Sequence, residues 1–282
     1  MIKKIGIVGS GTMGTGIAQT LILNGYQTVL NDQKLEILES SKKYLEKRLS
    51  REVTKERLSE KEKEKALDLL SLTAKLDELN DCDLIIEAAT ENMSVKKEIM
   101  KKLSDICNFD TILATNTSSL SITEIAQAIE KPERFIGIHF FNPVPLMKLV
   151  EVIKGLMTSQ EIEEKTIEFI KSINKTPIKV KEAPGFVVNR VLIPMINEAI
   201  GIYADGVASK EDIDTAMKLG ANHPIGPLAL ADLIGLDVCL AIMEVLHSEF
   251  GEAKYRPHPL LRKMVRAEML GRKSSKGFYD YA

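Results

Sequence analysis

A histidine and a glutamate, His139 and Glu151, stand at equal distances on either side of a loop that two prolines mark. The segment reads Gly137-Ile-His-Phe-Phe-Asn-Pro-Val-Pro-Leu-Met-Lys-Leu-Val-Glu-Val-Ile153, and each of the two residues is six positions from Pro145. If the flanking strands fold back about this loop, antiparallel pairing places the imidazole beside the carboxylate. The carboxylate would then fix the tautomer of the imidazole, and the imidazole would compensate a carboxylate in an apolar run. Such a pair is suited to general acid and base catalysis.

A glycine-rich turn, Gly9-Ser-Gly-Thr-Met-Gly14, directly follows the apolar N-terminal run and opens a helical pattern. This is the context in which such a turn binds a dinucleotide. Gly9 permits the tight turn, Gly11 lets the backbone approach a pyrophosphate, and Gly14 lets the helix pack closely on the strand. Thr12 and Met13 open the helix, whose unpaired amides and dipole favour phosphate. An ordinary glycine turn is the alternative for the motif taken alone.

An acidic residue, Asp32, ends the next predicted strand, 18 residues after Gly14. A carboxylate at this position accepts hydrogen bonds from an adenosine ribose and repels a 2′-phosphate. Strand, motif, helix and acidic residue together predict NAD rather than NADP as the cofactor. A histidine alone on a strand more often has a structural role, but coupling to Glu151 and to a dinucleotide site favours a catalytic one for His139.

A third polar cluster, Thr115-Asn-Thr-Ser-Ser-Leu120, follows another predicted strand. Ligands of open α/β sheets bind outside the carboxyl ends of the strands, so we expect Asn116 and Ser118 to face the cofactor crevice. Helix capping is the alternative function of these hydroxyls, with Ser119 or Ser121 as the N-cap. Ser121, with Glu124 as a capping-box partner, fits that alternative well. This assignment leaves Asn116 and Ser118 free for ligand contacts.

The elements that must position these residues alternate between short β-branched runs and helical patterns, which predicts a doubly wound, Rossmann-type parallel sheet in an α/β domain. A strongly charged segment with helical periodicity, residues 34–72, is longer than one crossover helix requires, and we expect a helical excursion there. The predicted strands are Lys4–Val8, Thr28–Asn31, Leu84–Glu87, Ile112–Thr115 and Phe135–His139.

A smaller all-α domain is expected after this α/β domain. A run at 148–153, a helix at 159–173 and a strand at 178–180 lead to Pro184-Gly185, a plausible hinge. Residues 1–184 are therefore expected to form the NAD-binding domain and residues 185–282 the helical domain. The helical patterns beyond the hinge cover Val187–Gly206, Ser209–Leu219, Pro227–Phe250 and His258–Leu270.

Composition excludes several other classes of protein. A net charge of -2 and a pI near 6.2 give no basic field for nucleic acid. Cys82, Cys107 and Cys239 are odd in number and far apart, so neither a disulfide framework nor a metal site is expected. No apolar stretch approaches the roughly 20 residues of a membrane span. We therefore expect a cytoplasmic protein without membrane, metal or nucleic-acid partners.

Taken together, these motifs closely resemble those of the 3-hydroxyacyl-CoA dehydrogenases, and the chain length is that of stand-alone members acting on short acyl chains. The resemblance implies reversible hydride transfer between NADH and carbon 3 of a substrate such as acetoacetyl-CoA. It also implies a homodimer through the helical domain. The further matching segments are Pro184-Gly-Phe-Val-Val-Asn-Arg190, Ser209-Lys-Glu-Asp-Ile-Asp-Thr-Ala-Met-Lys-Leu-Gly220 and Lys276-Gly-Phe-Tyr279.

The resemblance assigns roles to individual residues. It implies that His139 exchanges the proton at the substrate's 3-oxygen and that Glu151 is its electrostatic partner. The family's positions that orient the thioester and 3-oxo groups match Ser118, Asn116 and Asn189. The family's NAD-contacting positions match Glu91, Lys96, Asn142 and Lys273. The alternative for each of these four is a solvated surface residue without a ligand.

A basic segment offers a place for the anionic nucleotide of CoA. Seven lysines and arginines stand against three glutamates between Lys42 and Arg57, although such helices are often simply solvated. The resemblance implies CoA contacts at Arg48 and Lys55, together with Ser118. Many members of the family have a serine where this chain has Arg48.

Two other functions compete with this interpretation. One is a dehydrogenase of free hydroxy acids, which acts without CoA and commonly uses a lysine base. The other is a non-catalytic NAD-binding structural relative, such as the lens crystallins of this family. The pairing of His139 with Glu151 and the basic segment argue against the first. The presence of Ser118 and Asn189 beside that pair argues against the second, since a structural protein has no chemical need for them.

Overall fold

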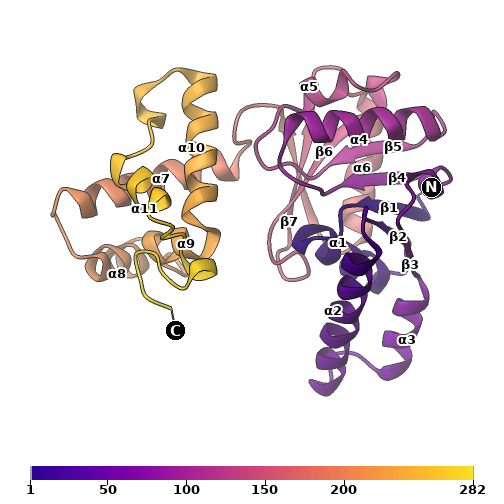
Figure 1. The fold of residues 1–282 in the computed structure, drawn as a ribbon, viewed down its shortest axis with the longest axis horizontal. Helices are drawn as coiled ribbons and strands as arrows, with labels where there is room; N and C mark the ends of the chain where they lie inside the picture. The colour runs from indigo at the N-terminus through magenta and orange to yellow at the C-terminus, as the bar shows by residue number, and fades with distance from the viewer. Residues whose placement is uncertain (1, 282) are drawn as a thin grey trace. The chain divides into compact units, whose positions relative to one another are not determined.

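The computed structural model describes residues 2–281. They divide into two compact units, with the boundary between Ala183 and Pro184. The first unit is an α/β layer structure and the second is helical (Figure 1).

The first unit is built on an eight-stranded sheet with the order β3-β2-β1-β4-β5-β6-β7-β8. Neighbouring strands run parallel except β6 and β7, which are antiparallel. The central strands are apolar almost throughout because helices cover both faces of the sheet. The strands are β1 (Lys4–Val8), β2 (Gln27–Asn31), β3 (Leu70–Thr73), β4 (Leu84–Glu87), β5 (Ile112–Thr115), β6 (Phe135–Phe140), β7 (Leu149–Lys154) and β8 (Thr176–Lys181).

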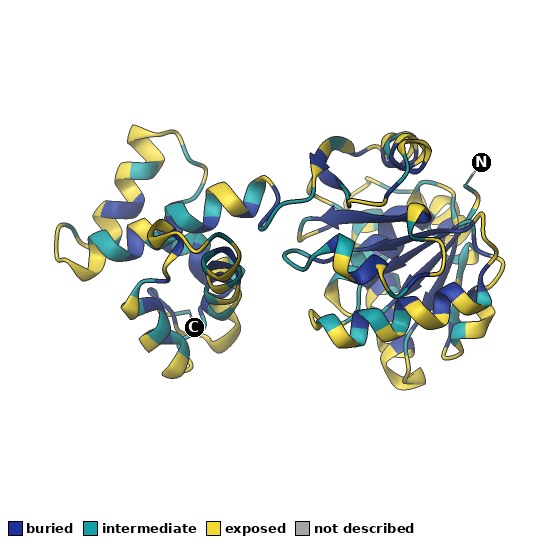
Figure 2. Ribbon diagram, turned by 90° about the horizontal axis from the view of Figure 1, so that it is seen from above, coloured by how far each residue is buried: buried dark blue, intermediate teal, exposed yellow. Residues whose placement is uncertain are grey.

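The strands of this sheet are buried between helices (Figure 2), and alternate strand residues pack against the helices of the two faces. On one face, α1 (Thr12–Leu23) and α6 (Gln160–Ser172) share a core with Ile7, Ile86 and Ile138. On the other face, Ile122 lies against Gly137, where an added Cβ would come within 2.8 Å of the Ile122 side chain. The remaining helices of this unit are α2 (Leu35–Thr54), α3 (Glu60–Asp68), η1 (Leu76–Leu79), α4 (Met93–Ile106), α5 (Ile122–Ala126) and η2 (Pro132–Arg134).

The expected helical excursion is present as α2 and α3, but it ends earlier than residue 72. Its last residues form β3, an edge strand that pairs in parallel with β2. The expectation of helix up to Leu72 was therefore wrong. A four-residue strand that is only partly buried has too short an apolar alternation to stand out from the charged helix before it.

The second unit packs its helices around one apolar core that contains Ile196, Met243 and Leu246. Two buried aspartates tie its chain together. Asp214 accepts hydrogen bonds from the first amides of α9, and Asp232 accepts from the amides of Phe278 and Tyr279 near the C-terminus. The helices are α7 (Val188–Ala204), α8 (Lys210–Gly220), α9 (Pro227–Ile234), α10 (Leu236–Phe250), η3 (Ala253–Tyr255), α11 (Pro259–Arg266) and η4 (Arg272–Ser274).

The single helix expected over Pro227–Phe250 is two helices, α9 and α10. The chain breaks at Gly235, whose φ of 106° lies outside the helical region and is strained for any residue with a side chain. None of the helices among residues 2–281 combines the length and the hydropathy that crossing a membrane requires.

Candidate active site

The glycine-rich turn links the end of β1 to α1 and has the steric demands of a dinucleotide-binding turn. Gly9 has a φ of 101°, and a Cβ added there would lie 2.7 Å from the Ala88 carbonyl oxygen. A Cβ on Gly14 would lie 1.8 Å from the Gly9 oxygen, whereas a Cβ on Gly11 would meet nothing within 4 Å. Gly9 and Gly14 are thus required by the fold itself. Gly11, the N-cap of α1, borders open space, which fits a turn that a pyrophosphate approaches closely.

Asp32 follows β2 and holds this turn in place. Its Oδ2 atom accepts hydrogen bonds from the Ser10 amide and hydroxyl, each at 2.9 Å. The carboxylate therefore has a structural partner that the sequence did not indicate. Its expected role toward a ribose remains a prediction, and Thr12 and Met13 lie in the first turn of α1, as the motif requires.

His139 and Glu151 face each other across the antiparallel β6–β7 pair, as their spacing predicted. Nδ1 of His139 lies 2.7 Å from Oε2 of Glu151, whose side chain has no exposed surface. An ionised carboxylate has no donor and can only accept hydrogen bonds, so Nδ1 carries the proton of this contact. The Phe141 ring, with its centroid 4.4 Å from that of the imidazole, packs against the histidine. Strand geometry thus fixes both the position and the tautomer of a buried imidazole.

Asn116 and Ser118, expected to be free for ligands, both have protein partners. The Asn116 side-chain oxygen accepts a hydrogen bond from the Phe140 amide at the end of β6, at 2.9 Å. The amide and the hydroxyl of Ser118 both donate to Oε1 of Glu91, at 2.9 and 3.1 Å. Ser121 caps α5 as predicted, but Glu124 pairs with Lys97. The polar loop after β5 is therefore held from two sides.

Glu91 and Lys96 belong to a cluster of charges at the carboxyl ends of β4 and β5. Lys96 is only 1% exposed, so the alternative of a solvated surface lysine is wrong. Its Nζ atom lies 2.8 and 2.9 Å from the two carboxylate oxygens of Glu87 and 3.4 Å from Oε2 of Glu91. Burial alone would raise the pKa of Glu91, but the Lys96 charge and hydrogen bonds from Thr117 and Ser118 lower it below its ordinary value.

With this geometry in hand, comparison with known proteins identifies the family. The sequence profile of the 3-hydroxyacyl-CoA dehydrogenase NAD-binding domain matches residues 4–183, and that of the C-terminal domain of the same family matches residues 185–281. The chain belongs to the 3-hydroxyacyl-CoA dehydrogenase family. Its first unit is the NAD-binding domain of that family, and it contains both the glycine-rich turn and the His139–Glu151 pair.

Individual relatives resemble the chain over its whole length. It is 58% identical over 278 residues to 3-hydroxybutyryl-CoA dehydrogenase of Clostridioides difficile, and the matched region covers 99% of each chain. It is 45% identical to human mitochondrial hydroxyacyl-coenzyme A dehydrogenase, over 100% of this chain and 92% of the human one. The crystal structure of (S)-3-hydroxybutyryl-CoA dehydrogenase from Ralstonia eutropha superimposes with a TM-score of 0.97 at 49% identity, covering 100% of both chains.

The other residues expected to bind ligands in this 3-hydroxyacyl-CoA dehydrogenase are spread over both units. Arg48 and Lys55 lie seven residues apart on α2 and its C-cap, so they project from the same side of the helix. Asn142 is exposed in the loop between β6 and β7. In the helical unit, Asn189 is buried in the first turn of α7, and Lys273 forms an ion pair with Asp237. The roles of these five residues remain predictions.

Two residues of this dehydrogenase that support the site were missed at the sequence level. Glu87 is fully buried at the end of β4 and compensates Lys96. Lys175 donates hydrogen bonds to the carbonyl oxygens of Val144 and Met147, at 2.5 and 2.7 Å, and so holds the loop that joins the strands of His139 and Glu151. A charged residue inside an apolar strand, as in Leu84-Ile-Ile-Glu87, was the available signal for the first.

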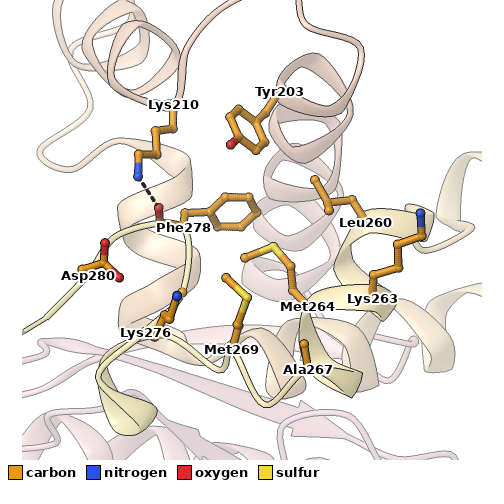
Figure 3. A pocket seen from close by; sticks show the side chains of 11 residues that line it. Tyr203, Lys210, Leu260, Lys263, Met264, Ala267, Met269, Lys276, Phe278 and Asp280 are labelled. Carbon is orange, nitrogen blue, oxygen red and sulfur yellow. Dashed lines mark hydrogen bonds between the residues drawn. The ribbon is translucent and has the colours of Figure 1, made fainter.

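The helical unit of this dehydrogenase also contains a cavity of about 430 Å³. Figure 3 shows Tyr203, Met264 and Phe278 around this space, with Lys210 donating a hydrogen bond to the Phe278 carbonyl oxygen. The expected catalytic residues are not among those that line it. Its lining comprises Tyr203, Lys210, Leu260, Lys263, Met264, Ala267, Met269, Lys276, Gly277, Phe278 and Asp280.

Proposed function

We propose that this chain is an NAD-dependent 3-hydroxybutyryl-CoA dehydrogenase, which interconverts acetoacetyl-CoA and L-3-hydroxybutyryl-CoA. The observation that carries the proposal is the buried His139–Glu151 pair, which ends in an imidazole of fixed tautomer at the carboxyl end of β6. The family, and the names of relatives that match the whole chain, support the same substrate class.

The residues of the first unit suit an NAD-binding site. The glycine-rich turn and the start of α1 would hold the phosphates, and Asp32 would accept hydrogen bonds from the adenosine ribose. When bound, the nicotinamide supplies a hydride to carbon 3 in reduction and accepts one in oxidation. We assign further contacts with the cofactor to Glu91, Lys96, Asn116, Ser118, Asn142 and Lys273.

His139 would move the proton that accompanies this hydride. Since Nδ1 donates to Glu151, Nε2 is the nitrogen that exchanges a proton with the substrate. In reduction Nε2 gives its proton to the 3-oxygen, and in oxidation it removes a proton from the 3-hydroxyl group. The Glu151 carboxylate stabilises the imidazolium form in both directions. No covalent intermediate is needed.

Ser118 would orient the acyl group or the cofactor through the lone pairs of its hydroxyl oxygen. The hydroxyl donates its hydrogen to Oε1 of Glu91 at 3.1 Å, which sets the direction of the side chain. We assign the same positioning role to Asn116 and to Asn189 of the helical unit. Arg48 and Lys55 would bind the phosphates of CoA, because two cationic side chains on one side of α2 match an anionic nucleotide.

The helical domain, residues 185–282, would contribute to the substrate cleft and form a homodimer. Large apolar side chains are exposed on this unit, among them Val191 at 69%, Val207 at 73% and Leu219 at 83%. We also propose a cytoplasmic location, since Cys82, Cys107 and Cys239 are free and buried, as is usual in a reducing compartment.

A spectrophotometric assay tests the proposed function. The purified chain should oxidise NADH when acetoacetyl-CoA is added, with kcat/KM at least about tenfold higher for NADH than for NADPH, because Asp32 would repel a 2′-phosphate. Free acetoacetate serves as the control substrate and should be reduced far more slowly. Turnover of acetoacetate at the rate of its CoA thioester, or no turnover of either, would contradict the proposal.

A further inference from the structure

The cavity of about 430 Å³ in the helical unit is lined by two segments that the proposed reaction does not use. These segments, residues 209–220 and 276–279, are among those by which the sequence resembles its family. Lys210 comes from the first segment, and Lys276 and Phe278 come from the second. The proposed transfers of a hydride and a proton give neither segment a role. Their meeting at one cavity points to a further site.

Two buried aspartates fix the wall that the C-terminal segment forms. Asp232 is 1% exposed and accepts hydrogen bonds from the amides of Phe278 and Tyr279, both at 2.9 Å. Asp214 is 4% exposed and accepts one from the Tyr279 hydroxyl at 3.0 Å. A Cβ added to Gly277 would lie 2.0 Å from Oδ1 of Asp232, so the segment lies closely against this carboxylate. The wall is therefore in place before a ligand arrives.

The floor of the cavity is apolar. Tyr203, near the end of α7, and Phe278 meet edge to face, with ring centroids 5.8 Å apart and an angle of 87° between the rings. Leu260, Met264 and Met269 complete this floor (Figure 3). Methionine side chains adapt their shape to the group that packs on them. Such a floor suits an aliphatic chain.

Positive charge dominates the rim of the cavity. Lys210, Lys263 and Lys276 line it, and Asp280 is the acidic side chain among the lining residues that the structure describes. Lys210 is already engaged, since its Nζ atom lies 3.9 Å from Oε1 of Glu211. Lys263 and Lys276 are exposed, and neither forms an ion pair with another residue in the range 2–281. Two ammonium groups are thus available to an anionic head group.

We propose that this cavity is a binding site for a medium-chain carboxylate, an amphiphile with one aliphatic chain and one anionic head group. The chain packs on Tyr203, Met264 and Phe278, and the carboxylate lies between Lys263 and Lys276. Ligand sites are usually preformed, mostly apolar hollows of about 300–1,000 Å³ with a few polar groups that orient the ligand, and this cavity has those properties. The site lies within the helical unit and does not depend on the reaction proposed above.

The test uses octanoate as the probe and a single tryptophan as the reporter. The chain contains no tryptophan, so Tyr203→Trp places its only indole at the cavity wall. Fluorescence titrations with octanoate, and with 1-octanol as the uncharged probe, measure binding. The matched control is Phe109→Trp, because Phe109 is another exposed aromatic residue and the Nζ atom of Lys131 lies 3.9 Å from its ring centroid.

Two pairs of lysines separate the role of the head group from that of the chain. The rim variant, Lys263→Gln/Lys276→Gln, removes both ammonium groups. The matched charge control, Lys61→Gln/Lys65→Gln, alters two exposed lysines on α3. Both are made in the Tyr203→Trp protein for fluorescence. Both are also made in the protein that keeps Tyr203, whose melting gives a second readout because a ligand of the folded state raises Tm.

The expected results follow from the division into floor and rim. Octanoate should change the emission of the Tyr203→Trp protein to saturation and leave that of Phe109→Trp unchanged. The rim variant should raise the octanoate Kd roughly tenfold or more, the scale of one lost charge-assisted contact. Octanol should bind more weakly than octanoate and equally well with and without the rim lysines. The rise in Tm with octanoate should shrink in the rim variant and persist in the charge control.

Three results would overturn the proposal. One is an emission of the Tyr203→Trp protein that octanoate does not change. The second is an octanoate Kd that is the same in the rim variant and its parent, which would leave an apolar surface without a head-group site. The third is an emission that follows the protein concentration and not the octanoate concentration, which would show that a second copy of the chain covers the cavity.

Discussion

Glu151 lies directly opposite His139 in the β6–β7 register, with its Oε2 atom 2.7 Å from Nδ1 of the imidazole. The chain achieves this by reversing direction between two buried strands, so that residues 12 positions apart become neighbours. Because one ring nitrogen is committed to the carboxylate, the other is the proton carrier in the proposed reaction.

Glu151→Gln should lower kcat by about 10- to 100-fold, since an amide keeps the size of the side chain but cannot stabilise an imidazolium. Binding of NADH should change little, because Glu151 is assigned no contact with the cofactor. Steady-state kinetics at saturating acetoacetyl-CoA and NADH measure the first quantity, and fluorescence titration measures the second. A kcat equal to that of the wild type would remove Glu151 from the mechanism.

Alanine substitutions at two glycines of the turn should have different effects, one on stability and the other on cofactor binding. Gly14→Ala should destabilise the protein by about 2 kcal/mol or more, since its Cβ would collide with the Gly9 carbonyl oxygen. The Cβ added in Gly11→Ala meets nothing within 4 Å, so this variant should melt like the wild type. It should bind NADH at least about tenfold more weakly, because the Cβ occupies the space that the pyrophosphate approaches. Unchanged NADH affinity in Gly11→Ala would argue against a pyrophosphate at this turn.

Reversing one charge on α2 should affect only substrates that carry the CoA nucleotide. Lys55→Glu is expected to raise KM for acetoacetyl-CoA roughly tenfold, the scale of one lost contact between a cation and a phosphate. Acetoacetyl-N-acetylcysteamine, which lacks the nucleotide, should be reduced equally well by variant and wild type. Lys101→Glu, which alters an exposed lysine on α4, is the matched control. An equal effect on both substrates would place CoA elsewhere.

Glu91 should make stability depend on pH in the acid range. Its pKa is lowered in the folded chain despite burial, which opposes the shift, because Lys96 and the hydrogen bonds from Thr117 and Ser118 stabilise the carboxylate. A lowered folded-state pKa adds stability above the unfolded-state value, and this stability is lost as the pH falls through the folded-state value. The Tm difference between wild type and Glu91→Gln should therefore be larger at pH 7 than at pH 3.5. A Tm difference that grows toward acid pH would contradict a lowered pKa of Glu91 in the folded chain.

The sequence predicted the parts of the site that depend on local patterns. The glycine-rich turn follows from residues within one strand-turn-helix unit, and the His139–Glu151 pair follows from symmetry about a short loop. The strand ends were predicted to within one residue for β1, β2, β4 and β5, because parallel strands covered on both faces are continuous apolar runs.

What the sequence could not supply were contacts that depend on packing between distant elements. The eight residues between Glu87 and Lys96 contain no pattern that brings the two together, and only the docking of α4 does so. Likewise, Asn116 was expected to be free because its partner is an amide at the end of a different strand, β6. Gly235 was hidden within an apolar helical pattern, since its φ of 106° is a tertiary feature.

The central claim is that His139 is the acid and base of the reaction. The most direct measurement is single-turnover reduction of acetoacetyl-CoA by bound NADH, with wild type and His139→Gln compared at the same cofactor saturation. We expect the variant to bind NADH as the wild type does and to transfer hydride on the order of a hundredfold or more slowly. Hydride transfer at the wild-type rate in the variant would contradict the account.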